Sequence, residues 1–216
     1  MKSSTRKSTE RIVGIAIFSA LAFVVSFLVH IPIQFLTFDA KDAIITVAAF
    51  IYGPITAPII SFIAALIELV TISDTGWYGF IMNFASSAVY SLTASLIYSS
   101  KRSINRALIG IYSAVALTTG VMLLLNILVT PIYMGVSREA VIELMPTLLF
   151  PFNLAKSMMN AAITMLIYKP VSVAMKRARL IEGSVDLRFN RQSVIMLCCG
   201  GVTLAAAIVI FVILCR

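Results

Sequence analysis

Residues 150–160 read FPFNLAKSMMN and begin an apolar run that continues to Tyr168. A run of this length is typical of a helix that crosses a lipid bilayer. At helical spacing Asn153, Lys156 and Asn160 fall on one face. A charged group in hydrocarbon costs about 2.5–3.5 kcal/mol, so this face is expected to turn toward protein and to mark a functional site. The alternative is that Lys156 lies near the outer end of the helix and extends its amine to the membrane surface.

The composition of the whole chain indicates the same class of protein. Hydrophobic residues make up 60% of the 216 residues and charged residues only 12%, whereas soluble domains carry about 25% charged residues. The sequence therefore predicts an all-α integral membrane protein. The net charge of +8 comes from short basic clusters between apolar segments, and this distribution argues against nucleic acid as a partner.

Seven apolar segments follow one another along the chain, and glycines, prolines or polar residues separate them. They lie at residues 12–31, 43–52, 55–72, 80–98, 107–129, 146–168 and 193–214. The second segment is brief for a full crossing. If it counts as one, the sequence predicts a bundle of six core helices and an appended C-terminal transmembrane helix. Residues 37–42 are expected to form only a polar connection, and the fifth helix is expected to stop at Pro131.

Basic residues cluster at one end of this predicted bundle. They precede the first helix, follow the fourth and follow the sixth, whereas the opposite connections have an acidic balance that includes Asp39, Asp42 and Asp74. By the positive-inside rule the N-terminus is cytoplasmic. We expect a basic cytoplasmic N-terminus at 1–11, a six-helix membrane domain at 12–175, a basic cytoplasmic linker at 176–192 that favours anionic lipid, and the additional transmembrane helix at 193–216.

Sequence patterns of common enzymes and metal sites are missing. The only histidine is His30, and the cysteines at 198, 199 and 215 have no spaced Cys or His partners, so neither a disulfide framework nor a zinc site is predicted. No P-loop, nucleophile elbow or dinucleotide fingerprint occurs. An acid–base pair of Glu68 and Lys156 is conceivable, but no activated nucleophile accompanies it. We predict that the protein is not an enzyme and that any step driven by ATP needs another subunit.

Polar side chains gather toward the outer ends of the predicted helices. Asn83, Asn126 and Asn153 place carboxamides at similar depth on three helices, with Lys156 and Asp42 nearby. Aromatic residues flank this set, namely Phe38, Trp77, Tyr78, Phe84, Tyr133 and Phe152. Stacking rings and a few amides suit a flat heteroaromatic ligand that bears hydroxyls. The alternatives are that the amides join helices, that the rings form an interfacial belt, and that the loop aspartates are solvated charges or a helix cap.

Small residues are frequent in the first predicted helix. Ala16 and Ala20 are accompanied by other small side chains at Gly14, Ser19, Ala22 and Ser26. A surface of this type allows another helix to approach closely. The approaching helix can belong to a partner protein or to the same bundle.

Several blocks of sequence occur in an order that indicates a family. They are LTFDAKDA followed by FIYGPITAP, the segment 79–98, NILVTPIY at 126–133, and FNLAKSMMN. Over residues 10–175 the chain resembles the riboflavin-specific substrate-binding (S) component of energy-coupling factor (ECF) vitamin transporters. The resemblance implies a six-helix subunit of the bacterial cell membrane, without a cofactor of its own. Such a subunit captures riboflavin from outside and joins a transmembrane coupling subunit and two ATPase subunits.

The resemblance also implies roles for individual residues. It implies ligand contacts at Asn83, Asn126, Asn153, Lys156 and Asp42, and a contact with the coupling subunit at Ala16 and Ala20. The last apolar segment departs from the six-helix pattern, which leaves its role and its effect on partner docking open. Two other functions remain compatible with the sequence: an S component for another vitamin or heterocycle, and a membrane assembly subunit that does not transport.

Overall fold

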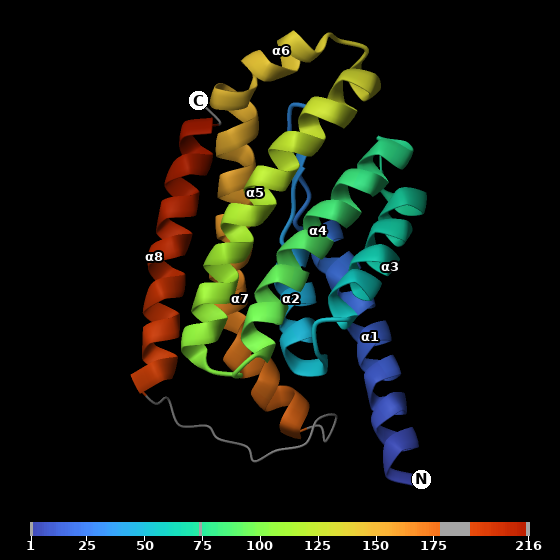
Figure 1. The fold of residues 1–216 in the computed structure, drawn as a ribbon, viewed down its shortest axis with the longest axis vertical. Helices are drawn as coiled ribbons and strands as arrows, with labels where there is room; N and C mark the ends of the chain where they lie inside the picture. Colours follow the sequence, from blue (N-terminus) through green and yellow to red (C-terminus); the bar gives the residue numbers. More distant parts are fainter. Residues whose placement is uncertain (1, 74, 178–190, 215–216) are drawn as a thin grey trace.

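The computed structural model describes residues 2–73, 75–177 and 191–214. Asp74, Cys215 and most of the expected linker at 176–192 lie outside these ranges. The described chain is almost entirely helical (Figure 1), with α1 (Lys2–Leu28), α2 (Lys41–Tyr52), α3 (Thr56–Thr71), α4 (Gly76–Ser99), α5 (Ile104–Met134), α6 (Arg138–Glu143), the π-helix η1 (Met145–Leu149), α7 (Phe150–Arg177) and α8 (Arg191–Leu214). The predicted all-α fold with an additional C-terminal helix is confirmed.

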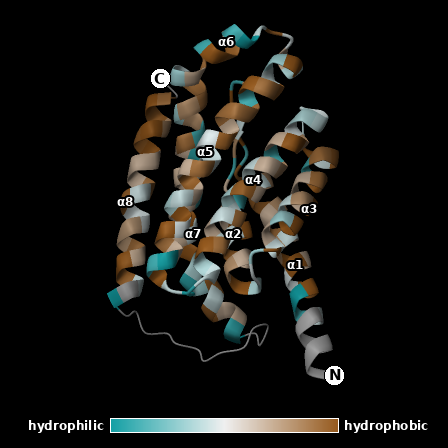
Figure 2. Ribbon diagram, viewed as in Figure 1, coloured by the Kyte–Doolittle hydropathy of each residue, from teal (hydrophilic) through white to brown (hydrophobic). Residues whose placement is uncertain are grey.

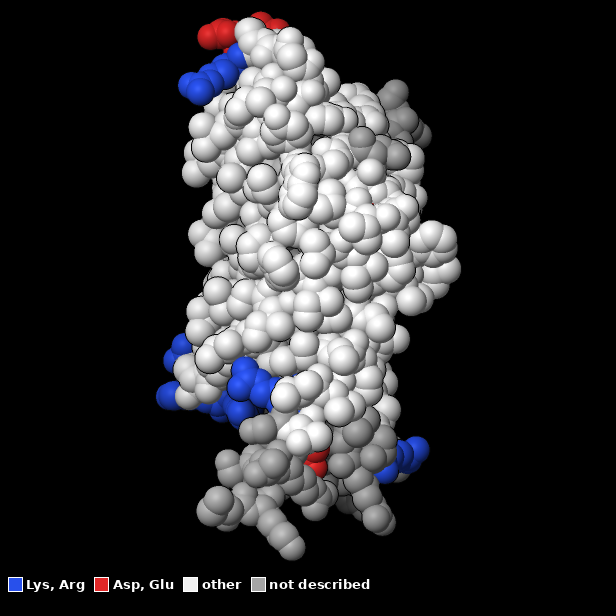
Figure 3. Space-filling model, turned by 90° about the vertical axis from the view of Figure 1, so that its right-hand side faces the viewer, with Lys and Arg blue, Asp and Glu red and all other residues white. Residues whose placement is uncertain are grey.

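The long helices form a bundle in which successive helices run in opposite directions (Figure 1). Five segments of the described chain are long and apolar enough to cross a membrane: α1, α4, α5, η1 with α7, and α8. Apolar residues cover the outside of these helices and hydrophilic residues concentrate near the two ends (Figure 2). The face in Figure 3 carries no charged residue over its middle, where a bilayer would surround it.

A β-hairpin fills the place where the sequence predicted only a polar connection. Strands β1 (Ile31–Ile33) and β2 (Leu36–Phe38) pair antiparallel, with Ile31 opposite Phe38. Two strands of three residues are too short to give a clear sequence signal. After the hairpin, α2 has 12 residues and spans about 18 Å, less than the thickness of the hydrocarbon core. The hairpin and α2 together replace one full crossing.

Two helix ends also differ from prediction. Helix α5 continues past Pro131 to Met134, so the expected stop at Pro131 is wrong. A proline removes one backbone hydrogen bond, which a helix of 31 residues tolerates. The helix ends instead at Gly135, whose φ of 66° lies in the left-handed region that glycine adopts without strain. Helix α1 begins at Lys2, so the basic N-terminal segment is part of the first helix.

Helix α2 lies inside the bundle, in contact with α1, α3, α4 and α7. Nine of its 12 residues are buried, including Ala43, Ala48 and Ala49, whose small side chains allow four helices to surround it. This position places the polar residues at its first turn, Lys41 and Asp42, in the interior of the protein. The fold thus brings charged groups to the centre of an apolar bundle.

Candidate functional site

Lys156 of α7 is buried and points into the bundle. Its ammonium donates to the Asp39 carboxylate, with Nζ and Oδ2 2.8 Å apart, and to the Thr37 carbonyl oxygen at 3.2 Å. Only 7% of the residue is exposed. The alternative that Lys156 extends to the membrane surface is therefore wrong, because both of its partners belong to the hairpin and the loop that follows it inside the bundle.

A second lysine completes the charge network. Lys41 Nζ lies 2.5 Å from Glu68 Oε2 and 3.6 Å from Asp39 Oδ2. Asp39 therefore sits between two ammonium groups, and each of the four charges has an opposite charge beside it, as buried charges require. The conceivable pair of Glu68 and Lys156 does not form, since Glu68 pairs with Lys41 and Lys156 pairs with Asp39.

Asp42 is also buried but has a different partner, on α4. Only 2% of the residue is exposed, and its Oδ1 accepts a short hydrogen bond of 2.5 Å from the Ser87 hydroxyl of α4. Asp39 is equally buried. The alternative that these aspartates are solvated loop charges is therefore wrong for both.

Asn160 joins α7 to the start of α2. Its Oδ1 accepts from the Ala43 backbone N–H at 3.0 Å, and its Nδ2 donates to the Asp39 carbonyl oxygen at 3.0 Å. Asn153, Lys156 and Asn160 are all buried, so the polar face of this helix turns inward as its spacing predicted. Asn160 thus provides a hydrogen-bond partner for the backbone at the first turn of α2. Asn153 and Lys156 lie closer to the start of α7.

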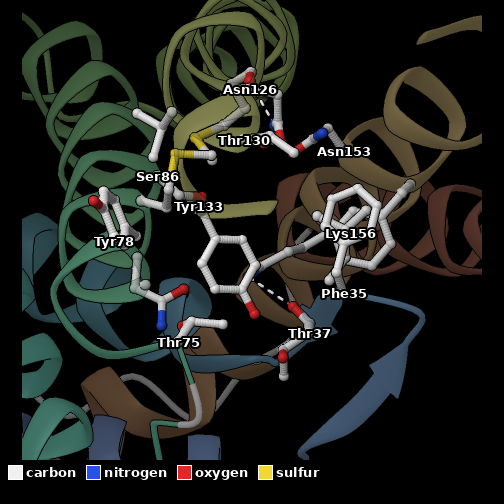
Figure 4. Close-up of a pocket in the computed structure, with 17 residues that line it drawn as sticks. Phe35, Thr37, Thr75, Tyr78, Ser86, Asn126, Thr130, Tyr133, Asn153 and Lys156 are labelled. Carbon is white, nitrogen blue, oxygen red and sulfur yellow. Dashed lines mark hydrogen bonds between the residues drawn. The ribbon is translucent and has the colours of Figure 1, made fainter. Parts of the chain in front are cut away.

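A cavity opens beside this network between the hairpin and the ends of α4, α5 and α7 (Figure 4). It holds about 720 Å³ of space free of protein atoms, a volume that includes space open to the surroundings. Its lining includes Phe35, Leu36, Thr37, Thr75, Tyr78, Met82, Asn83, Ser86, Asn126, Thr130, Tyr133, Phe152, Asn153 and Lys156. Four of the five expected ligand residues thus meet at one cavity, and Asp42 does not belong to its lining.

The polar groups of the cavity lie on opposite sides. Figure 4 shows Asn126, Thr130 and Asn153 together on one side and Thr37 and Thr75 on the other. The amide nitrogen of Asn126 donates to the Met122 carbonyl at 2.7 Å, and that of Asn153 donates to the Leu149 carbonyl at 2.8 Å. These bonds remain within each helix, so they do not join helices. A carboxamide has a second N–H and two acceptor lone pairs, so both groups can bind a ligand as well.

Asn83 differs from the other two amides. Its nitrogen donates to Glu68 Oε2 at 3.1 Å and so links α4 to α3, as the alternative of amides that join helices predicted. It also lines the cavity. The other oxygen of Glu68, Oε1, is buried and has no hydrogen-bond partner.

The aromatic residues of the predicted set divide between the cavity and other places. Tyr78, Tyr133 and Phe152 line the cavity. Trp77 is 68% exposed, as an interfacial belt predicts. The hairpin residues of the lining, Phe35, Leu36 and Thr37, were not among the predicted ligand contacts, because the sequence carries no signal for the hairpin that brings them to the cavity. Thr130 had a signal, since it lies four residues after Asn126 and donates to its Oδ1 at 2.9 Å.

No group of three or more metal-binding side chains occurs in the part of the chain that the structure describes.

Comparison with known proteins identifies the family. The family described as "ECF transporter, substrate-specific component" matches residues 10–168. The protein belongs to this family. Its subunits bind substrates for transport and catalyse no reaction, so the prediction that the chain is not an enzyme is confirmed, and no cofactor is expected.

Two individual relatives agree with the family match. The chain is 30% identical to the riboflavin transporter RibU of Staphylococcus aureus (strain TCH60) over 182 residues, which cover 79% of this chain and 95% of the relative. A solved structure of the S component of a bacterial ECF transporter is similar with a TM-score of 0.67 and 29% identity, over 79% of this chain and 99% of that chain. The protein is thus a multi-pass membrane S component of a vitamin transporter.

Proposed function

We propose that the protein binds riboflavin in the cavity beside Lys156 and is the capture subunit for its uptake. The observation that carries the proposal is the meeting of Asn126, Asn153 and Lys156 with two tyrosine rings, Tyr78 and Tyr133, at one cavity. An isoalloxazine offers a flat surface for the rings and polar atoms at its edge for the amides. The name of the Staphylococcus aureus relative supports this choice of vitamin.

The cavity can select its ligand by hydrogen bonding. An ammonium group has three N–H donors, and two of those on Lys156 go to Asp39 and Thr37, so one remains for an acceptor on the ligand. A ligand that left a buried amide or this donor unpaired would lose about 1–3 kcal/mol for each group. The wrong heterocycle is therefore rejected by unpaired polar groups and requires no chemical step.

We place the cavity on the outside of the cell. Basic residues lie at the opposite end of the bundle, including Lys101 and Arg102 between α4 and α5 and Arg106 in the first turn of α5, and Figure 3 shows basic residues at that end. By the positive-inside rule this end and the N-terminus are cytoplasmic. The cavity, at the starts of α4 and α7 and the end of α5, then faces outward.

The outer face of α1 is the proposed docking surface for the coupling subunit. Ala16 and Ala20 are exposed, whereas Ser19 and Ala22 are buried, and a Cβ at Gly14 would lie within 2.6 Å of the Tyr52 side chain. Some small residues of this helix therefore pack inside the bundle, whereas Ala16 and Ala20 remain exposed and can contact a partner helix. Helix α8 lies at the other edge of the bundle (Figure 1) and does not cover this face.

Titration of the purified, ligand-stripped protein with riboflavin tests the ligand. We expect one flavin per chain, with quenched emission because the ring stacks on tyrosines. Folded, monodisperse protein that leaves flavin absorption and emission unchanged would refute riboflavin, and a screen of other vitamins and heterocycles would then identify the substrate of the same cavity.

A matched pair of substitutions tests the partner. Ala20→Leu adds bulk to the proposed docking face, and Ala205→Leu adds the same bulk to an exposed position on α8. We expect Ala20→Leu to retain flavin binding but to abolish uptake and co-purification with a coupling subunit and two ATPase subunits, whereas Ala205→Leu retains all three. Equal uptake by both variants would exclude this face.

A further inference from the structure

Helix α8 lies outside the family match, which ends at residue 168, yet it packs along α7 and α5. Thr203 and Ala207 are buried in this contact, and the Tyr112 hydroxyl of α5 lies 2.7 Å from the Thr203 hydroxyl. At Gly200 the helices approach so closely that a Cβ would lie 3.2 Å from the Met165 Cβ. The helix is therefore an integral part of the bundle.

The far end of α8 reaches the hairpin. The ring of Phe211 packs edge-to-face against the ring of Phe38, with centroids 5.3 Å apart and an interplanar angle of 68°. Phe38 is 4% exposed and is the last residue of β2. Thr37 lines the cavity, whereas Phe38 is not among its lining residues and packs against α8.

The two neighbours of Phe38 are the partners of Lys156. The Thr37 carbonyl and the Asp39 carboxylate both accept from its ammonium. The hairpin that carries them consists of two strands of three residues and forms no larger sheet among the described residues. An isolated hairpin is at best marginally stable, so its position depends on what packs against it.

We propose that α8 is a positioning element of the ligand site: Phe211, through Phe38, fixes β2 so that Thr37 and Asp39 hold the Lys156 ammonium at the cavity. This inference rests on the proposed function, because its effect is measured as ligand affinity. Helix α8, which departs from the six-helix pattern, would thereby contribute to ligand binding by positioning β2. Phe211 is not among the lining residues of the cavity and acts through the strand.

The first test compares Phe211→Ala with Val209→Ala, which lies two residues away on the same helix and is 58% exposed. We expect Phe211→Ala to weaken riboflavin binding about three- to tenfold, the range that an edge-to-face aromatic contact corresponds to, through faster dissociation. Val209→Ala is expected to bind like the unaltered protein. Unchanged affinity of folded Phe211→Ala protein would overturn the proposal.

A second measurement does not depend on the ligand. Hydrogen exchange of the backbone amides at 36–41 is expected to accelerate in Phe211→Ala and to remain unchanged in Val209→Ala. If Phe211→Ala does not fold, Phe211→Leu retains apolar volume while it removes the ring contact, and the same acceleration is expected. If the unaltered protein ignored riboflavin, the proposed ligand would fail and this exchange comparison alone would decide the positioning role; equal exchange in all variants would overturn it.

Discussion

Replacement of Lys156 by methionine tests the two roles of this side chain separately: the ion pair with Asp39, which affects stability, and the proposed hydrogen bond to the ligand, which affects affinity. The substitution preserves length and apolar volume but removes the charge and its donors. Asp39 then loses the ammonium at 2.8 Å and retains Lys41 at 3.6 Å. Loss of one partner from a buried pair costs about 3–5 kcal/mol, and because Lys41 remains we expect the lower end, about 3 kcal/mol, in the free energy of unfolding.

The effect on ligand binding follows from the remaining donor. A hydrogen bond from a charged group contributes about 1.5–3 kcal/mol, so Lys156→Met is expected to weaken riboflavin binding about 10- to 150-fold. Lys41→Met is the matched control. It breaks the pair with Glu68 and should also lower stability, but Lys41 does not line the cavity, so its effect on affinity should be much smaller.

Fluorescence titration with riboflavin in detergent gives the affinities, and denaturant unfolding of the same samples gives the stabilities. Addition of Asp39→Asn to Lys156→Met removes the carboxylate that has lost its nearer ammonium and should restore part of the stability without restoring affinity. A direct contact of Lys156 with the ligand is refuted if folded Lys156→Met protein binds riboflavin as tightly as the unaltered chain. It is also refuted if Lys41→Met weakens riboflavin binding as much as Lys156→Met does.

Two further predictions concern an amide and a helix crossing. Asn153→Ala should weaken flavin binding about 5- to 150-fold, the equivalent of one polar group left unpaired, whereas Asn105→Ala, an exposed amide at the other end of the bundle, should leave the titration unchanged. Gly110→Ala would place a Cβ 2.6 Å from the Ala94 carbonyl oxygen, so overpacking should lower the unfolding free energy by about 1–3 kcal/mol. Gly120→Ala has open space and should be neutral or slightly stabilising in the same unfolding assay.

The charge network gives the hairpin a defined position in an otherwise apolar bundle. The Asp39 carboxylate forms ion pairs with lysines of α2 and α7, and its backbone carbonyl accepts from Asn160. Displacement of this loop would leave several buried polar groups unpaired at once. The same network holds Lys156 at the cavity, so the interactions that stabilise the hairpin also prepare the proposed ligand site before a ligand arrives.

The sequence alone determined the class of the protein, the order of its long helices and the inward polar face of α7. These properties depend on residues close together in the chain. Asn153, Lys156 and Asn160 share a face because of the helical repeat, and a lysine within an apolar span must find partners in protein. The three amides of the cavity, Asn83, Asn126 and Asn153, were also predictable, because each lies near one end of a long helix.

Only the tertiary structure decided which charges pair and which residues surround the cavity. Lys156 and Asp39 are 117 residues apart, and Lys41 and Glu68 are 27 apart; the one pair considered from the sequence, Glu68 with Lys156, does not form. The hairpin, the burial of Asp42 and the contact of Phe38 with Phe211 were equally hidden. Hydropathy and periodicity are local properties, whereas ion pairing and ring packing depend on distances that exist only after the helices have packed.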